Sequence, residues 1–150
     1  MVWEAYKLVK QNKGSAGVDS QSLAEFEKVR VAELYKLWNR LASGSYFANN
    51  VKRVEIDKGG GKTRPLGIPT VSDRIAQQVV KTYLEPRLEK EFLNNSYGYR
   101  PNKSAHDAVK EVQQNVLKYK WVIDLDIQAF FEHVNHELLY KALAVHVSEK

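Results

Sequence analysis

The sequence predicts an α+β fold, because segments with helical and strand-like apolar patterns alternate along its 150 residues. Hydrophobic residues make up 43% of the chain and charged residues 27%, a balance typical of a globular domain with its own core. No apolar run approaches the ~20 residues that a membrane-spanning helix needs. We therefore expect one domain without a membrane span, in the order helices, β-hairpin, helices, strand and helix.

The first half should contain two helical regions and a β-hairpin. Apolar stripes at helical spacing predict a helix over residues 2–11 and one or two helices over residues 20–42, with a Gly- and Ser-containing loop between them. The β-prone stretches "VKRVEID" and "TRPLGIP" flank "KGGGK", which predicts a hairpin with a glycine tip. Pro65 restricts the second strand to an edge of the sheet or to its own first residues.

Two capping patterns mark helices in the second half. Thr70 and Asp73 have the spacing of a capping box, and so do Ser104 and Asp107. We expect Pro86 to kink or restart the first of these helices near residue 85. The second should continue to about residue 119.

A strand and a final helix should complete the chain. "WVIDLDI", residues 121–127, has the β-branched and aromatic content of a strand, and Asn135 can cap a helix that extends to about residue 147. Alternation along this strand would bury Ile123, Leu125 and Ile127 on one face. The carboxylates of Asp124 and Asp126 would lie on the other face.

The net charge of +5 is concentrated in the middle of the chain. Residues 51–103 carry 11 basic and 6 acidic side chains, which makes this third a candidate surface for a polyanion such as nucleic acid. The chain has no cysteine, so it forms no disulfide or thiolate metal site. The absence of cysteine and of a signal-peptide pattern leads us to expect a cytoplasmic protein.

The aspartates of "VIDLDI" are the first candidate for chemistry. Two like charges on one strand face repel each other, and a divalent cation or a basic partner would relieve the repulsion. Carboxylate oxygens suit Mg²⁺, which binds through one or two carboxylates together with substrate phosphates. A solvent-exposed strand end with ordinary ion pairs is the alternative. Phe130 and Phe131 follow at once, either as core residues or as the wall of a pocket.

Two basic segments are candidates for binding phosphates or RNA. The glycine tip carries Lys58, Lys62 and Arg64, and a glycine backbone allows close approach to a ligand. "SYGYRPNKS", residues 96–104, interleaves tyrosines with basic residues, a combination suited to stacking on bases and contacting phosphates. An ordinary polar turn and a structured loop are the respective alternatives.

Four blocks of the sequence, in order, resemble those of group II intron reverse transcriptases. They are "NKGSAGVD", "GKTRPLGIPTVSDRIAQQVV", "SYGYRPNKSAHDAV" and "VIDLDIQAFFEHVNHELL". The resemblance as a whole extends over about residues 10–147. The resemblance implies the fingers and partial palm of a right-hand polymerase, mostly helical with a β-hairpin and a palm strand. It implies fingers with an N-terminal extension over about residues 1–118 and the start of the palm over about residues 119–150.

The resemblance also implies roles for individual residues. Asp126 is similar to the first catalytic aspartate, which binds Mg²⁺ with help from the backbone carbonyl of Ile127. Phe131 matches the residue under the incoming sugar, with Phe130 beside it, and Lys58 and Arg64 match residues that grip the triphosphate of the dNTP. The remaining candidates should contact template RNA; they are Lys13, Gly14, Lys62, Tyr97, Tyr99, Arg100 and Lys103. Asp124 has no assigned catalytic role.

The partners that the resemblance implies are template RNA, in particular intron RNA, a DNA or RNA primer, and dNTP. The family's second carboxylate pair, in a Tyr-x-Asp-Asp turn, does not occur in these residues, so we expect the 150-residue polypeptide alone to be inactive. Two alternatives stay open: a reverse transcriptase of a CRISPR-associated, diversity-generating or defence system, and a non-catalytic RNA-binding module. The sequence also leaves open whether the protein forms a homodimer.

Overall fold

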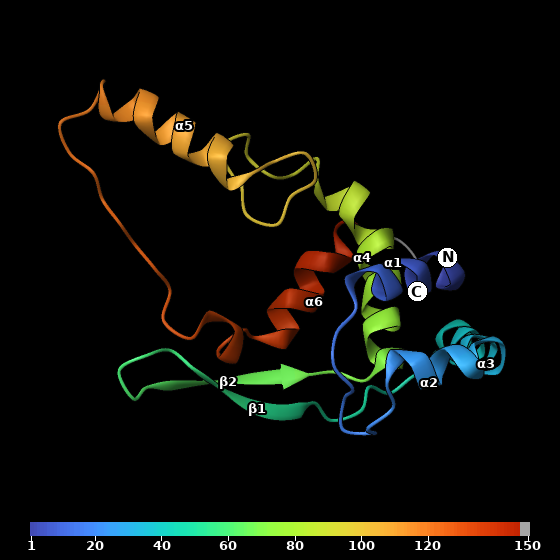
Figure 1. The fold of residues 1–150 in the computed structure, drawn as a ribbon. Coiled ribbons are helices and arrows are strands. Elements are labelled where there is room, and N and C mark those ends of the chain that lie inside the picture. The colour runs from blue at the N-terminus through green and yellow to red at the C-terminus, as the bar shows by residue number, and fades with distance from the viewer. Residues whose placement is uncertain (148–150) are drawn as a thin grey trace. The chain divides into compact units, whose positions relative to one another are not determined.

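The computed structural model describes residues 1–147 (Figure 1). The chain divides into two units. The first unit is Met1–Leu84 and the second begins at Glu85. In order along the chain, the helices and strands are α1 (Val2–Asn12), α2 (Leu23–Lys28), α3 (Arg30–Ala42), β1 (Lys52–Asp57), β2 (Thr63–Ile68), α4 (Val71–Leu88), α5 (Ala105–Val116), the 3₁₀ helix η1 (Phe130–Glu132) and α6 (His136–Ala144). Mixed helices with a two-stranded antiparallel sheet confirm the predicted α+β class.

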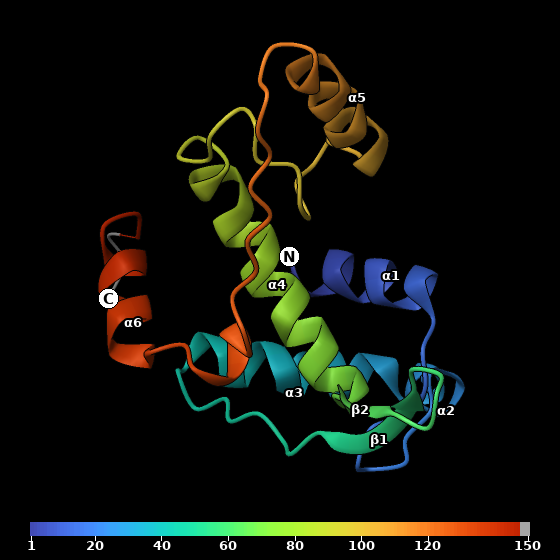
Figure 2. The same cartoon turned by 90° about the vertical axis from the view of Figure 1, so that its left-hand side faces the viewer.

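The first unit has a small helical core. Helices α1, α2 and α3 pack with the first half of α4 (Figure 2), and each contributes apolar side chains to one cluster. Phe26 and Ile75 are fully buried there, and the ring of Tyr6 stacks on Phe26 at a centroid distance of 5.9 Å. Burial of such side chains is worth about 1.5–3 kcal/mol each, so this cluster provides the main stabilisation of the unit.

The predicted hairpin is confirmed. β1 pairs antiparallel with β2 in the register Lys52↔Ile68 to Asp57↔Thr63, and Pro65 lies opposite Glu55 in a sheet where both strands are edges. The tip closes with a hydrogen bond of 2.8 Å from the backbone N–H of Lys58 to the carbonyl of Lys62. Gly59, Gly60 and Gly61 all have positive φ angles between 64° and 82°, a conformation that only glycine adopts at low cost in three successive residues.

The second unit has helices but no buried residue within 85–147. The capping box that opens α5 is present, because Ser104 and Asp107 hydrogen-bond each other's backbone N–H. Asn135 caps α6 by accepting a hydrogen bond from the N–H of Leu138 at 3.1 Å, as predicted. Helix α5 ends at Val116, three residues earlier than expected.

The expected strand over residues 121–127 is wrong. This segment has no regular secondary structure, and Ile123, Leu125 and Ile127 are 82%, 87% and 69% exposed instead of buried. A strand needs a neighbouring strand for its backbone hydrogen bonds and a packed face for its apolar side chains. Among residues 1–147 the only strands are β1 and β2, which pair with each other, so this segment has neither.

A restart of the helix at Pro86 is also wrong, because α4 continues through Pro86 to Leu88. The ring removes one helical hydrogen bond, and it does so only two residues from the end of the helix. The helical hydrogen-bond pattern resumes directly after Pro86, with a hydrogen bond of 2.9 Å from the N–H of Glu89 to the carbonyl of Glu85.

Candidate functional site

The hairpin tip brings together three cationic candidates in the first unit. Lys58, Lys62 and Arg64 are exposed and lie on or next to a glycine turn. Gly59 donates its N–H to the carboxylate of Asp57 at 2.7 Å, which fixes the start of the turn. Adding a Cβ at any of the three tip glycines meets no atom within 4 Å, so the tip presents an open backbone flanked by cations.

The loop after α1 is fastened to the start of α4 by Arg74. Its guanidinium donates hydrogen bonds to the backbone carbonyls of Lys13 at 3.3 Å and Ser15 at 3.0 Å. A Cβ at Gly14 would lie 2.3 Å from a terminal nitrogen of Arg74, and a Cβ at Gly17 would lie 2.7 Å from the backbone of Thr70. The sequence identified Lys13 and Gly14 as candidates for RNA binding but missed the arginine that holds them.

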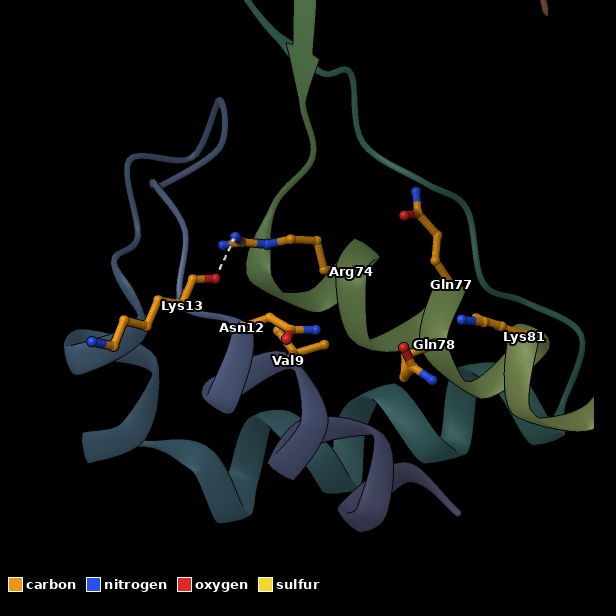
Figure 3. A pocket seen from close by; sticks show the side chains of 7 residues that line it. All are labelled: Val9, Asn12, Lys13, Arg74, Gln77, Gln78 and Lys81. Atoms are coloured by element: carbon orange, nitrogen blue, oxygen red, sulfur yellow. Dashed lines mark hydrogen bonds between the residues drawn. The ribbon is translucent and has the colours of Figure 1, made fainter. Parts of the chain in front are cut away.

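A cavity of about 330 Å³ lies beside this loop (Figure 3). The end of α1, the first residue after it and one face of α4 form its wall. Its lining side chains are polar or cationic apart from one valine; they are Val9, Asn12, Lys13, Arg74, Gln77, Gln78 and Lys81. Arg74, Gln78 and Lys81 are spaced i, i+4, i+7, so a single helical face carries them.

A buried carboxylate organises the opposite side of the start of α4. Asp73 is 2% exposed and accepts hydrogen bonds from the Thr70 hydroxyl at 2.6 Å, from the backbone N–H of Asn49 at 3.3 Å and from the Tyr46 hydroxyl. Burial raises the pKa of Asp73, but these hydrogen bonds together lower it more, so its pKa lies below the ordinary value. Burial and the same carboxylate raise the pKa of Tyr46. The sequence predicted the cap by Thr70 but not this network, which ties the loop before β1 to α4.

The loop before α5 places its tyrosines and cations in different environments. The side chain of Arg100 is 8% exposed and is used within the unit, because its guanidinium donates hydrogen bonds to Glu89 at 2.7 Å and to the carbonyl of Leu93 at 2.6 Å. Tyr99 is fully exposed on a backbone with a φ of 56°. In this loop Tyr99 is therefore an accessible aromatic face, whereas the role of Arg100 toward RNA stays a prediction.

Tyr97 and Lys103 lie together in the same loop. The ammonium group of Lys103 lies 4.6 Å from the centroid of the Tyr97 ring and also donates to the carbonyl of Asn94. The Tyr97 hydroxyl donates to the carboxylate of Glu111, and this hydrogen bond raises the pKa of Tyr97. The structure thus brings together two of the predicted RNA contacts.

The candidate metal ligand lies in the irregular segment of the second unit. Asp126 is exposed and has no hydrogen bond or ion pair with any of residues 1–147, so both carboxylate oxygens are available to a ligand. Within the same residues no group of three or more His, Cys, Asp or Glu side chains lies together as a metal site. The donors that the sequence suggests, the Asp126 carboxylate and the Ile127 carbonyl, are hard oxygens of the kind that Mg²⁺ binds.

The two phenylalanines follow directly in η1. The rings of Phe130 and Phe131 are 5.4 Å apart and meet edge to face at 71°. Phe131 is 89% exposed and Phe130 50%, so neither is a core residue of the described chain. Ala129, with a φ of 50°, begins the turn that presents both rings.

The predicted residues thus fall into separate groups. Lys58, Lys62 and Arg64 share the hairpin tip of the first unit, whereas Asp126, Ile127 and both phenylalanines follow one another in the second. None of the helices in the described part of the chain has the length and apolarity to cross a membrane.

Comparisons with known proteins show which family these features belong to. The family model for reverse transcriptase (RNA-dependent DNA polymerase) matches residues 56–149. Protein YkfC of Escherichia coli (strain K12) is 36% identical over 153 residues, which cover 97% of this chain and 40% of that protein. Group II intron-encoded protein LtrA of Lactococcus lactis subsp. cremoris is 32% identical over 138 residues, covering 90% of this chain and 22% of that protein.

A relative with lower sequence identity is also encoded in an intron. The putative COX1/OXI3 intron 1 protein of Saccharomyces cerevisiae is 29% identical over 150 residues, which cover all of this chain and 18% of that protein. The chain spans less than half the length of each of these relatives. These intron-encoded relatives confirm the resemblance to group II intron proteins, and with a family model that matches well over half of its residues, the chain belongs to the reverse transcriptase (RNA-dependent DNA polymerase) family.

Proposed function

We propose that the chain is the N-terminal part of an RNA-directed DNA polymerase of group II intron type. It would bind template RNA, with intron RNA as the natural template, together with a primer and dNTP. The observation that carries the proposal is the family match, which includes the hairpin tip and the segment from Asp126 to Phe131. The cytoplasmic location remains a prediction, and whether the protein forms a homodimer is left open.

In this proposal Asp126 and the backbone carbonyl of Ile127 hold Mg²⁺. When bound, Mg²⁺ in such sites activates the primer hydroxyl and stabilises charge on the transferred phosphate. Asp126 supports this role because its carboxylate has no competing partner among residues 1–147. Asp124 shares the segment but would lie about 6–7 Å away along an extended chain, too far to take the same coordination position.

The hairpin tip would bind the triphosphate of the dNTP. Lysine provides a point charge for phosphate oxygens and arginine can bind two of them at once, which suits Lys58 and Arg64 to this task. The open glycine backbone between them would allow close approach of the phosphates. Phe131, with Phe130 against its edge, would lie under the sugar and exclude a 2′-hydroxyl.

Template RNA would contact the loop after α1, the hairpin tip and the loop before α5. These carry Lys13 with Gly14, Lys62, and Tyr97 with Tyr99 and Lys103. A fully exposed ring such as that of Tyr99 is suited to stacking on an unpaired base, a contact worth about 1–3 kcal/mol.

RNA-templated primer extension tests the proposal. The full-length protein should incorporate dNTPs opposite an RNA template in the presence of Mg²⁺ and should stop when EDTA removes the metal. RNA binding with no extension under any of these conditions would instead favour a non-catalytic RNA-binding module.

A further inference from the structure

The β-hairpin of the first unit buries none of its own residues. Every residue from Lys52 to Ile68 is exposed or only partly buried in the described chain, and β2 leads directly into α4 (Figure 1). A two-stranded sheet alone is marginally stable at best. The orientation of the hairpin, and of Lys58 and Arg64 near its tip, therefore depends on how its two ends are held.

Both ends of the hairpin are held by one carboxylate, that of Asp73. Asn49, three residues before β1, donates its backbone N–H to one oxygen of Asp73 at 3.3 Å. Thr70, two residues after β2, donates its hydroxyl to the other oxygen at 2.6 Å. A single side chain thus joins the segment that enters the hairpin to the segment that leaves it. We refer to Asn49, Thr70 and Asp73 as the hairpin root.

The hairpin root lies on the most deeply buried part of the first unit. Val71 and Ile75, which precede and follow Asp73 on α4, are both fully buried in the helical core. The loop after α1 packs against the same point, because a Cβ at Gly17 would lie 2.7 Å from the backbone of Thr70. Asp73 therefore connects the hairpin to a close-packed part of the fold, which cannot shift without disturbing the core.

The length of the strands amplifies any movement at the root. A strand rises about 3.3 Å per residue, so the six residues of β1 place the tip about 20 Å from the root. A rotation of about 3° at the root would displace the tip by about 1 Å, and a displacement of that size can cost about a hundredfold in rate where groups must be aligned. The position of Lys58 and Arg64 is therefore sensitive to small changes at the root.

We infer that Asp73, acting through Asn49 and Thr70, is a positioning residue for binding of the dNTP triphosphate at the hairpin tip. The inference rests on the proposed function, because it assumes that Lys58 and Arg64 bind the triphosphate. It gives the buried carboxylate a role beyond the stability of the first unit. The affinity for dNTP would then depend on a residue about 20 Å from the phosphates.

A positioning role has a kinetic signature that a purely structural role lacks. When the root is loosened, the tip has the productive orientation for only a fraction of the time, and the apparent affinity for dNTP falls by that fraction. Saturating dNTP captures the productive orientation again, so KM rises while kcat is retained. A loss of folded protein would instead lower kcat per total protein and leave KM unchanged.

Thr70→Val in the full-length protein tests the inference, by RNA-templated extension at varied dNTP concentration with Mg²⁺. The variant keeps the shape of the side chain but removes the hydroxyl that joins the end of β2 to Asp73. We expect KM for dNTP to rise about tenfold and kcat to stay within about twofold of the wild-type value. Thr70→Ser, which keeps the hydroxyl, should have the wild-type KM.

Ser22→Ala is the matched control. Ser22 caps α2 by accepting a hydrogen bond of 3.2 Å from the N–H of Glu25, as Thr70 caps α4 by accepting one of 3.1 Å from the N–H of Asp73. Both residues belong to the first unit, and loss of either cap should destabilise it. Only Thr70 belongs to the hairpin root, so Ser22→Ala should keep the wild-type KM.

Hydrogen exchange of the full-length proteins, without nucleic acid or dNTP, gives a readout that needs no polymerase activity. The backbone amides of residues 52–68 should exchange faster in Thr70→Val than in Ser22→Ala, because only the first variant loosens the hairpin. Equal exchange in the two variants would overturn the inference.

The two readouts separate this inference from the proposed function. A wild-type KM in Thr70→Val protein that extends primers would overturn the inference and retain the polymerase, and so would a lower kcat with an unchanged KM. Faster exchange of the hairpin in a protein that never extends a primer would support the hold of the root on the hairpin and contradict the proposed function.

Discussion

Replacing the buried carboxylate of Asp73 with an amide tests how the first unit is held together. In Asp73→Asn one oxygen can still accept from the hydroxyl of Tyr46 and the N–H of Asn49, but both bonds lose the negative charge of their acceptor. The bond from the Thr70 hydroxyl to the other oxygen is also lost, because an amide nitrogen donates and can form only a neutral hydrogen bond there. A hydrogen bond to a charged group contributes about 1.5–3 kcal/mol and a neutral one about 0.5–1.5, a difference of about 1 kcal/mol for each bond. For the three bonds we therefore expect a loss of about 3 kcal/mol in the free energy of unfolding.

Urea unfolding followed by circular dichroism measures this loss. Asp126→Asn is the matched control, because it makes the same chemical change at an exposed carboxylate without partners among residues 1–147. It should change the free energy of unfolding by less than about 0.5 kcal/mol. Equal stabilities of the two variants would refute the argument that the Asp73 network fastens the loop before β1 to α4.

The same carboxylate predicts a pH dependence. The pKa of Asp73 is lower in the folded chain than the ordinary value near 3.8, so its contribution to stability is complete above that value. The contribution is lost as the pH falls through the lowered pKa, below about pH 4. Asp73→Asn should remove this part of the acid sensitivity, and an unchanged acid transition would contradict the assignment.

Two further substitutions test the N-terminal loop and the sugar contact. Gly17→Ala should cost about 1–3 kcal/mol in urea unfolding, because the new Cβ would lie 2.7 Å from the backbone of Thr70, whereas Gly98→Ala, whose Cβ meets no atom within 4 Å, should be near neutral. Phe131→Ala in the full-length protein should leave dNTP incorporation measurable and raise kcat/KM for ribonucleotides relative to dNTPs by about 10–200-fold. An unchanged ratio would remove Phe131 from the sugar contact and make Phe130 the next candidate.

Local patterns predicted most of the secondary structure because their stabilising contacts are local. The capping box of Ser104 and Asp107 joins residues three apart, and the glycine tip needs only its own backbone freedom. Both can be identified in a short stretch of sequence. The prediction of a strand over residues 121–127 was wrong because a strand depends on non-local contacts. It needs partner strands elsewhere in the chain, and the described residues provide none.

The candidate site was predictable where a motif marks it and not where distant residues meet. The segment from Asp126 to Phe131 is contiguous, so the sequence alone selects it. The fastening of Lys13 by Arg74 joins residues 61 positions apart, and sequence spacing cannot reveal such a pair. The spacing of Arg74, Gln78 and Lys81 places a polar stripe on one helical face, but the apolar stripe of the same helix is what predicts the helix, and a polar stripe alone does not distinguish a functional face from a solvated one.

The comparison of Asp126 with Asp124 in the full-length protein tests the central claim most directly. If Asp126 holds the catalytic metal, Asp126→Ala should reduce the single-turnover rate of RNA-templated extension by a thousandfold or more, since metal stabilisation of the transition state is worth roughly several kcal/mol. Asp124→Asn should keep a readily measurable rate, and both variants should bind RNA as the wild-type protein does. Extension by Asp126→Ala at a rate close to that of Asp124→Asn would contradict the account.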